Sequence, residues 1–259
     1  MNFSMLVSVM AAATLLPAMA MEWLRAPDVW RRASLVFAGI ACIVVAGLPD
    51  FGGSFARAVW GSLAMVLALF LIATVMDRGI ERLGPLLVAY CGAVGLLAVP
   101  FSERQAAGIW SGTALLHILP GLAGYALITL AAIAAVAADM QARALKARRV
   151  NWLLDRLPPL NESERHSFRF LIAAAVALSI AVSAGMALNW TQYGTILRID
   201  HKAMLTLVAL AATAGLLGAH AYSGLRGRQA VRWVLGVYLL LTLAFPGAKF
   251  VGDIVLGRG

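Results

Sequence analysis

Long apolar runs follow one another from end to end of this chain, and they constrain its fold more than any other feature. Each is close to the roughly 20 residues that an α-helix needs to cross a bilayer. With 62% hydrophobic and only 13% charged residues, the chain has more apolar surface than a soluble fold can bury. We predict an all-α, polytopic membrane bundle of about eight transmembrane helices, forming one domain over residues 1–259. The predicted spans are about 3–24, 33–49, 56–76, 83–100, 111–140, 168–190, 201–222 and 232–256.

The basic residues predict which way these helices cross the membrane. Most of the 21 lysines and arginines fall in the turns after the first, third, fifth and seventh runs. Because such residues collect on the cytoplasmic side, both termini are predicted to lie outside the cytoplasm. This placement also accounts for the net charge of +9 without a nucleic-acid partner.

The segment 141–167 is the one sizeable polar stretch. It is predicted to be a basic cytoplasmic connector, entered by a long fifth helix that emerges from the membrane. Asn161 with Glu164 three residues later is the pattern of a capping box, which predicts that the sixth helix starts there. Connector residues of this composition can also lie on the membrane surface.

Other features of the sequence argue against a processed or catalytic protein. The run ending Ala18-Met19-Ala20 resembles a signal-peptide cleavage site, but the first positive charge comes after it, which favours a retained helix. Cys42 and Cys91 lie within apolar runs and are interpreted as packing residues. The chain has no GxSxG, HExxH or nucleotide-binding motif, so no catalytic residue is assigned.

The four histidines sort into two pairs by depth in the predicted membrane. His117 and His201 lie near the outer ends of the fifth and seventh helices, and His166 and His220 lie at cytoplasmic ends. His201 and His220 are roughly 28 Å apart along one helix, so only members of the same pair can meet. Neutral imidazole is a ligand of haem iron. We predict His117 and His201 as iron ligands, with His220 and His166 as the alternative pair; the competing interpretation makes each an interfacial polar residue.

Residues near the two outer histidines are also predicted to contact a haem. Gly121 and Gly124 follow His117 on one helix face and are predicted to leave room for a flat macrocycle; alternatively, they let two helices pack closely. Cations near the outer face are predicted to meet the haem propionates. These are Arg198, Lys202 and Lys249.

Two aspartates near the outer face have predicted partners. Asp200 is placed to cap the seventh helix or to orient His201. Asp253 lies four residues after Lys249 and is placed to pair with it.

Several stretches resemble the cytochrome c assembly (CcsA/CcmC-like) family. They are His117-Ile-Leu-Pro-Gly-Leu-Ala-Gly-Tyr125, Leu154-Asp-Arg-Leu-Pro-Pro-Leu with Ser183-Ala-Gly-Met, Asp200-His-Lys202, His220, and Phe245-Pro-Gly-Ala-Lys-Phe-Val-Gly252. The resemblance is closest to the short YpjD/HemX-like branch. It covers residues 110–256 by motif and the first hundred residues by helix count, which gives a family core of about 56–256. Two family features are absent: the WWD segment before Asp200, and a second outer histidine, where Val255–Gly259 stands. We propose that His201 takes the place of that histidine.

The resemblance implies a function. It implies a haem-binding or haem-handling protein of the bacterial inner membrane that acts in cytochrome c maturation, with other maturation or haem-synthesis proteins as partners. One alternative is a regulatory or scaffolding protein of haem biosynthesis whose connector, 141–167, recruits a cytoplasmic partner. A third is a small-molecule transporter, although the sequence shows no paired helix breaks.

Overall fold

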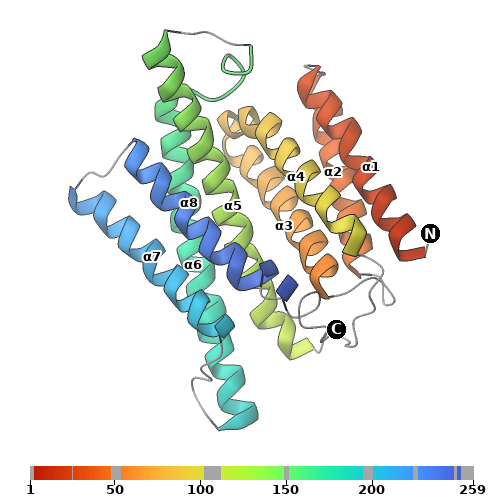
Figure 1. Ribbon diagram of the computed structural model, residues 1–259, viewed down its shortest axis with the longest axis vertical. Coiled ribbons are helices and arrows are strands. Elements are labelled where there is room, and N and C mark those ends of the chain that lie inside the picture. The colour runs from red at the N-terminus through yellow and green to blue at the C-terminus, as the bar shows by residue number, and fades with distance from the viewer. Residues whose placement is uncertain are drawn as a thin grey trace. The chain divides into compact units, whose positions relative to one another are not determined.

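The regular secondary structure is helical, as predicted (Figure 1). The computed structural model describes residues 3–24, 26–47, 54–101, 112–148, 152–194, 201–223, 227–247 and 250–251. Seven helices in this part of the chain are long and apolar enough to cross a membrane, and α7 adds a shorter apolar stretch, Thr206–Tyr222. The chain is therefore a multi-pass helical membrane protein, and lipid is its solvent.

The helices form two compact units, and the first unit is a ring of four helices. Within it, α1 packs against α2 and α4, and α3 packs against the same two helices. Each helix thus buries one face against its neighbours in the sequence, and the first and last helices close the ring. The helices are α1 (Phe3–Trp23), α2 (Asp28–Gly47), α3 (Ser54–Met76) and α4 (Gly84–Ala98).

Trp60 of α3 lies inside this first ring. Its side chain has no exposed surface, and its indole Nε1–H donates a hydrogen bond to the Ser8 hydroxyl of α1 over 3.2 Å. On α4, a Cβ added at Gly95 would lie 3.4 Å from Cη2 of the indole. One side chain therefore contacts both helices that flank the closing edge of the ring, and its only polar atom is satisfied.

Three phenylalanines pack together in the same unit although they come from distant parts of the sequence. Phe55 at the start of α3, Phe101 just after α4, and Phe250 near the end of the chain have ring centroids 5.3 to 5.6 Å apart, in edge-to-face arrangements. These are the geometries that aromatic quadrupoles favour. The C-terminal segment is thus tied to helices made at the beginning of the chain.

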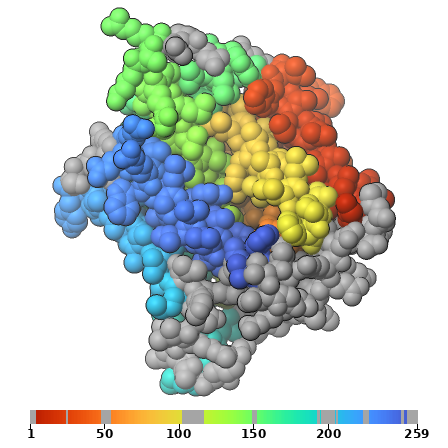
Figure 2. Space-filling view, viewed as in Figure 1, coloured from red at the N-terminus to blue at the C-terminus, as the bar shows by residue number. Residues whose placement is uncertain are grey.

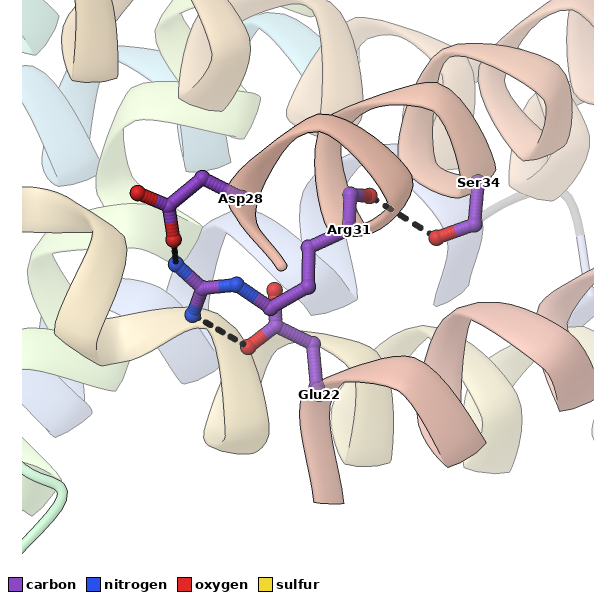
Figure 3. A network of polar contacts seen from close by, with 4 residues as sticks. All are labelled: Glu22, Asp28, Arg31 and Ser34. Carbon is purple, nitrogen blue, oxygen red and sulfur yellow. Dashed lines mark hydrogen bonds and ion pairs between the residues drawn. The ribbon is translucent and has the colours of Figure 1, made fainter. Parts of the chain in front are cut away.

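A buried carboxylate marks the end of α1. Glu22 is only 5% exposed, and Arg31 of α2 reaches it at 3.5 Å while also pairing with Asp28 at 2.5 Å (Figure 3). A Cβ at Gly84, the first residue of α4, would lie 2.6 Å from the Glu22 carboxylate. Glycine at this position therefore admits a negative charge to the N-terminus of α4, where the helix dipole favours it.

The second unit is also a ring of four helices. Here α5 packs against α6 and α8, and α7 packs against the same two helices; Figure 2 shows the blue α8 lying along α7 and the green α5. The core includes Tyr125 of α5 and Tyr238 of α8, whose rings stack at 6.3 Å. The helices are α5 (Gly112–Ala147), α6 (Leu160–Tyr193), α7 (His201–Ser223) and α8 (Arg228–Thr242).

The helix ends of the second unit refine the predicted boundaries. The 36 residues of α5 span about 54 Å, so part of this helix extends beyond the roughly 30 Å hydrocarbon core. The predicted connector at 141–167 is largely helical, because α5 continues to Ala147 and α6 begins at Leu160. The regular part of α8 ends at Thr242, where a π-helical turn, Leu243–Gly247, carries Pro246.

The predicted capping box at Asn161 and Glu164 is wrong. Pro159 is the N-cap of α6, it makes no side-chain cap hydrogen bond, and Asn161 lies inside the helix. Glu164 caps a different helix: its Oε1 accepts a 3.1 Å hydrogen bond from the backbone N–H of Gly227, the N-cap of α8. Gly227 has a φ of 67°, which favours glycine. The sequence spacing fitted a local box, but the carboxylate reaches a helix start 63 residues away.

Replacing Glu164 by alanine should destabilise the protein modestly. The change removes both a hydrogen bond and a negative charge from the α8 N-terminus, effects worth about 0.5–2 kcal/mol. We expect a lower apparent melting temperature in detergent, measured by loss of helical circular dichroism. Glu164→Gln, which keeps an acceptor oxygen, should lose less. Equal losses for the two variants would show that the hydrogen bond contributes nothing.

Candidate functional site

The imidazole of His117 lies against the next helix. His117 is in the second turn of α5, and its Nδ1 is 2.8 Å from the backbone carbonyl oxygen of Ala181 on α6. The side chain is otherwise exposed. The ring is therefore held at one nitrogen by the backbone of α6.

This hydrogen bond determines the protonation of the two ring nitrogens. A carbonyl oxygen can only accept, so in the bond to Ala181 the proton belongs to Nδ1 of His117. In the neutral imidazole, Nε2 then carries the lone pair. An Nδ1–H donated to a backbone carbonyl is the arrangement that orients metal-ligating histidines in proteins. His117 thus presents a nitrogen suited to a metal ion.

Gly185 of α6 gives the ring the space it occupies. A Cβ at this position would lie 2.9 Å from Cε1 and 3.0 Å from Nδ1 of His117. The shorter distance essentially never occurs for a real Cβ, and the longer one is tighter than most, so the imidazole lies over a position where α6 has no side chain. Gly185 lies in the stretch Ser183-Ala-Gly-Met that resembles the family, but nothing in the sequence predicts its contact with His117.

The two glycines after His117 face α6 as well. A Cβ at Gly124 would lie 2.7 Å from Cδ2 of Leu178, and one at Gly121 would lie 3.8 Å from Cβ of Ala181. Gly124 is therefore a point of close approach between α5 and α6, as the packing alternative predicts. The predicted role of Gly121 and Gly124 beside a macrocycle stays a prediction.

The other predicted outer residues are only partly within the described structure. His201 and Lys202 are the first two residues of α7, and the structure describes their backbone but not their side chains. Since α5 and α7 each pack against α6 and α8, they lie diagonally across the ring. The pairing of His117 with His201 therefore stays a prediction. Arg198, Asp200, Lys249 and Asp253 lie outside the described residues.

The alternative inner pair has different surroundings. His220 of α7 stacks on Phe168 of α6, with ring centroids 4.0 Å apart. Both line a pocket that also includes Glu164 and Gly227 and is otherwise lined mainly by apolar residues of all four helices. His166 is 1% exposed and lies outside the lining of this pocket.

The donor set bears on which metal group this part of the chain can hold. Among the residues that the structure describes, no three His, Cys, Asp or Glu side chains converge on one point. A haem iron needs only one or two axial ligands from the protein, because the macrocycle supplies the other four. Nε2 of His117 meets that requirement.

These features define a class: a multi-pass helical membrane protein in which one ring nitrogen of His117 is held by the backbone of a neighbouring helix. The chain belongs to the cytochrome C assembly protein family, whose sequence profile matches residues 31–256. It is 42% identical over 238 residues to an Azospirillum brasilense protein described as an uncharacterized 28.8 kDa protein in the nifR3-like 5′ region, covering 88% of this chain and 86% of that one. It is 28% identical to inner membrane protein YpjD of Escherichia coli K12, covering 87% and 89%. No solved structure matches the chain.

Proposed function

We propose that this protein handles haem for cytochrome c assembly in the bacterial inner membrane, with Nε2 of His117 as an axial ligand of the iron. The hydrogen bond from His117 Nδ1 to the Ala181 carbonyl carries the proposal, since it leaves the lone pair on Nε2. Family membership and the similarity to an inner membrane protein support the same conclusion.

The chain's own residues have separate tasks in this proposal. His117 holds the iron, and the carbonyl of Ala181 keeps the imidazole in one tautomer and one orientation. Haem, when bound, would supply an iron centre that can change oxidation state. The haem group as a whole could then be transferred to another protein. Arg198 and Lys202, which belong to the same unit as His117, would pair with the propionates, and the lipid around the helices would exclude water from the macrocycle.

His201 is the proposed second ligand. Helices that pack directly are about 8–10 Å apart, so helices on a diagonal of a four-helix ring are separated by roughly 11–14 Å. The diagonal positions of α5 and α7 support the pairing, because a macrocycle between two imidazoles needs the wider separation. Helices in direct contact, such as α5 and α6, leave no such gap.

Replacing His117 by alanine should abolish high-affinity haem binding. Wild-type protein purified in detergent is expected to bind haem with a Soret band typical of imidazole ligation, and the variant should bind at least about tenfold more weakly. Absorption titration with hemin measures both. Adding imidazole to His117→Gly should restore the band, because the free ligand replaces the missing one.

His220→Ala is the matched control at the other end of the helices. It should keep wild-type haem binding. If it loses the Soret band while His117→Ala keeps it, the haem belongs to the inner pocket and the assignment to His117 is wrong. A wild-type protein that shows no band after hemin addition would refute the proposal as a whole.

A further inference from the structure

We propose that Gly185 is a positioning residue for the iron ligand: the missing side chain lets the His117 imidazole lie on α6, where its Nδ1 reaches the Ala181 carbonyl. The inference rests on the proposed function. It assigns Gly185 a contribution to haem binding that acts wholly through His117.

The missing Cβ of Gly185 leaves the space in which the ring makes this bond. A Cβ at Gly185 would lie 2.9 Å from Cε1 and 3.0 Å from Nδ1, the two atoms on the side of the ring that faces Ala181. The imidazole is a rigid plane, so these atoms cannot yield separately. A methyl group at residue 185 therefore moves the whole ring and lengthens the 2.8 Å hydrogen bond.

The backbone gives no other reason for glycine at this position. In the described chain, the glycines with positive φ are Gly194 and Gly227, and Gly185 lies in the helical interior of α6. Glycine within a helix costs about 0.5–1 kcal/mol relative to alanine. At Gly185 the three atoms nearest to an added Cβ all belong to the imidazole of His117.

Loss of the hydrogen bond has a defined chemical consequence. The donated Nδ1–H fixes the tautomer and the ring plane, and removing such a partner typically weakens metal binding about 10- to 100-fold. Gly185→Ala should weaken hemin binding by that factor. It should also shift the Soret maximum and the electron paramagnetic resonance g-values of the ferric protein, which a mere loss of stability would leave in place.

The matched control is Gly218→Ala in α7. Nothing lies within 4 Å of a Cβ added there, so this variant makes the same chemical change without a contact. It should bind hemin as wild type does. Its apparent melting temperature should be equal to or above that of wild type, because alanine is the better helix former.

A double variant separates positioning from folding. In a His117→Ala background the imidazole is gone, so adding Gly185→Ala should raise the apparent melting temperature or leave it unchanged. If the methyl group lowers stability equally with and without His117, it meets something other than the imidazole and the inference is overturned.

The titrations distinguish the two proposals. If His117→Ala loses hemin and Gly185→Ala loses affinity with shifted spectra, both stand. If His117→Ala loses hemin but Gly185→Ala matches Gly218→Ala, the positioning role is refuted and the ligand assignment survives. If His117→Ala binds hemin as wild type does, the ligand assignment fails and the role of Gly185 fails with it.

Discussion

Trp60→Ala should lower the free energy of unfolding by about 3–5 kcal/mol, the usual cost of emptying the place of a large buried aromatic side chain. Trp60 has no exposed surface, and it contacts Ser8 of α1 and the backbone of α4 at Gly95. Its removal leaves a cavity within the first ring and deprives the buried Ser8 hydroxyl of its donor. Thermal unfolding in detergent, followed by circular dichroism, measures the loss.

Two further variants separate the causes. Trp60→Phe keeps most of the volume and loses the hydrogen bond, so it should cost only about 1 kcal/mol through that bond. Trp233→Ala removes the same residue type from an exposed position of α8, where the side chain is 54% exposed. It should cost far less than Trp60→Ala. If both alanine variants lost a similar free energy of unfolding, the role of Trp60 as a core residue of the first ring would be contradicted.

Gly124→Leu should be the most harmful change at the interface of α5 and α6. Even a Cβ at this position would lie 2.7 Å from Cδ2 of Leu178 and 3.4 Å from its backbone nitrogen. Leu178 is 1% exposed, so its side chain is enclosed by its neighbours. The two helices must separate, which typically costs 1–3 kcal/mol and more where backbone moves, so roughly 3 kcal/mol is expected. The apparent melting temperature of the purified protein reports the change.

Gly121→Ala is the control on the same helix face. Its Cβ would make an ordinary contact, 3.8 Å from Cβ of Ala181, so stability should be unchanged or slightly raised. If Gly124→Leu melts at the wild-type temperature, the interface is looser than the structure shows.

Hydropathy predicted the helices of this fold well, and it misplaced their ends where polar residues continue a helix. Asp28 and Arg31 belong to α2, and Glu162 and Arg165 belong to α6. A search for apolar runs misses such helical turns because they contain charged residues. A helix that leaves the bilayer no longer needs an apolar face, so its end is set by local signals. At α6 that signal is Pro158-Pro159, which stops the preceding segment.

The candidate site was predictable only in part. The sequence predicts that His117 lies near the outer end of its helix, because the depth of a residue in the membrane depends only on its position along one helix. Its contacts with Ala181 and Gly185 join residues 64 or more positions apart, and no spacing rule connects them. The same holds for Glu22 beside Gly84 and for Glu164 beside Gly227, where carboxylates approach the starts of distant helices.

The phenylalanine cluster has a consequence for biogenesis. Phe55 and Phe101 are translated before helices α5 to α8, but the third ring of the cluster, Phe250, is translated after them. Helices α1 to α4 can therefore insert and associate while the second unit is still being made. The N-terminal unit therefore acquires its full set of aromatic contacts only after the second unit has been translated. A nascent chain that stops before Phe250 would lack the contacts that the third ring makes with Phe55 and Phe101.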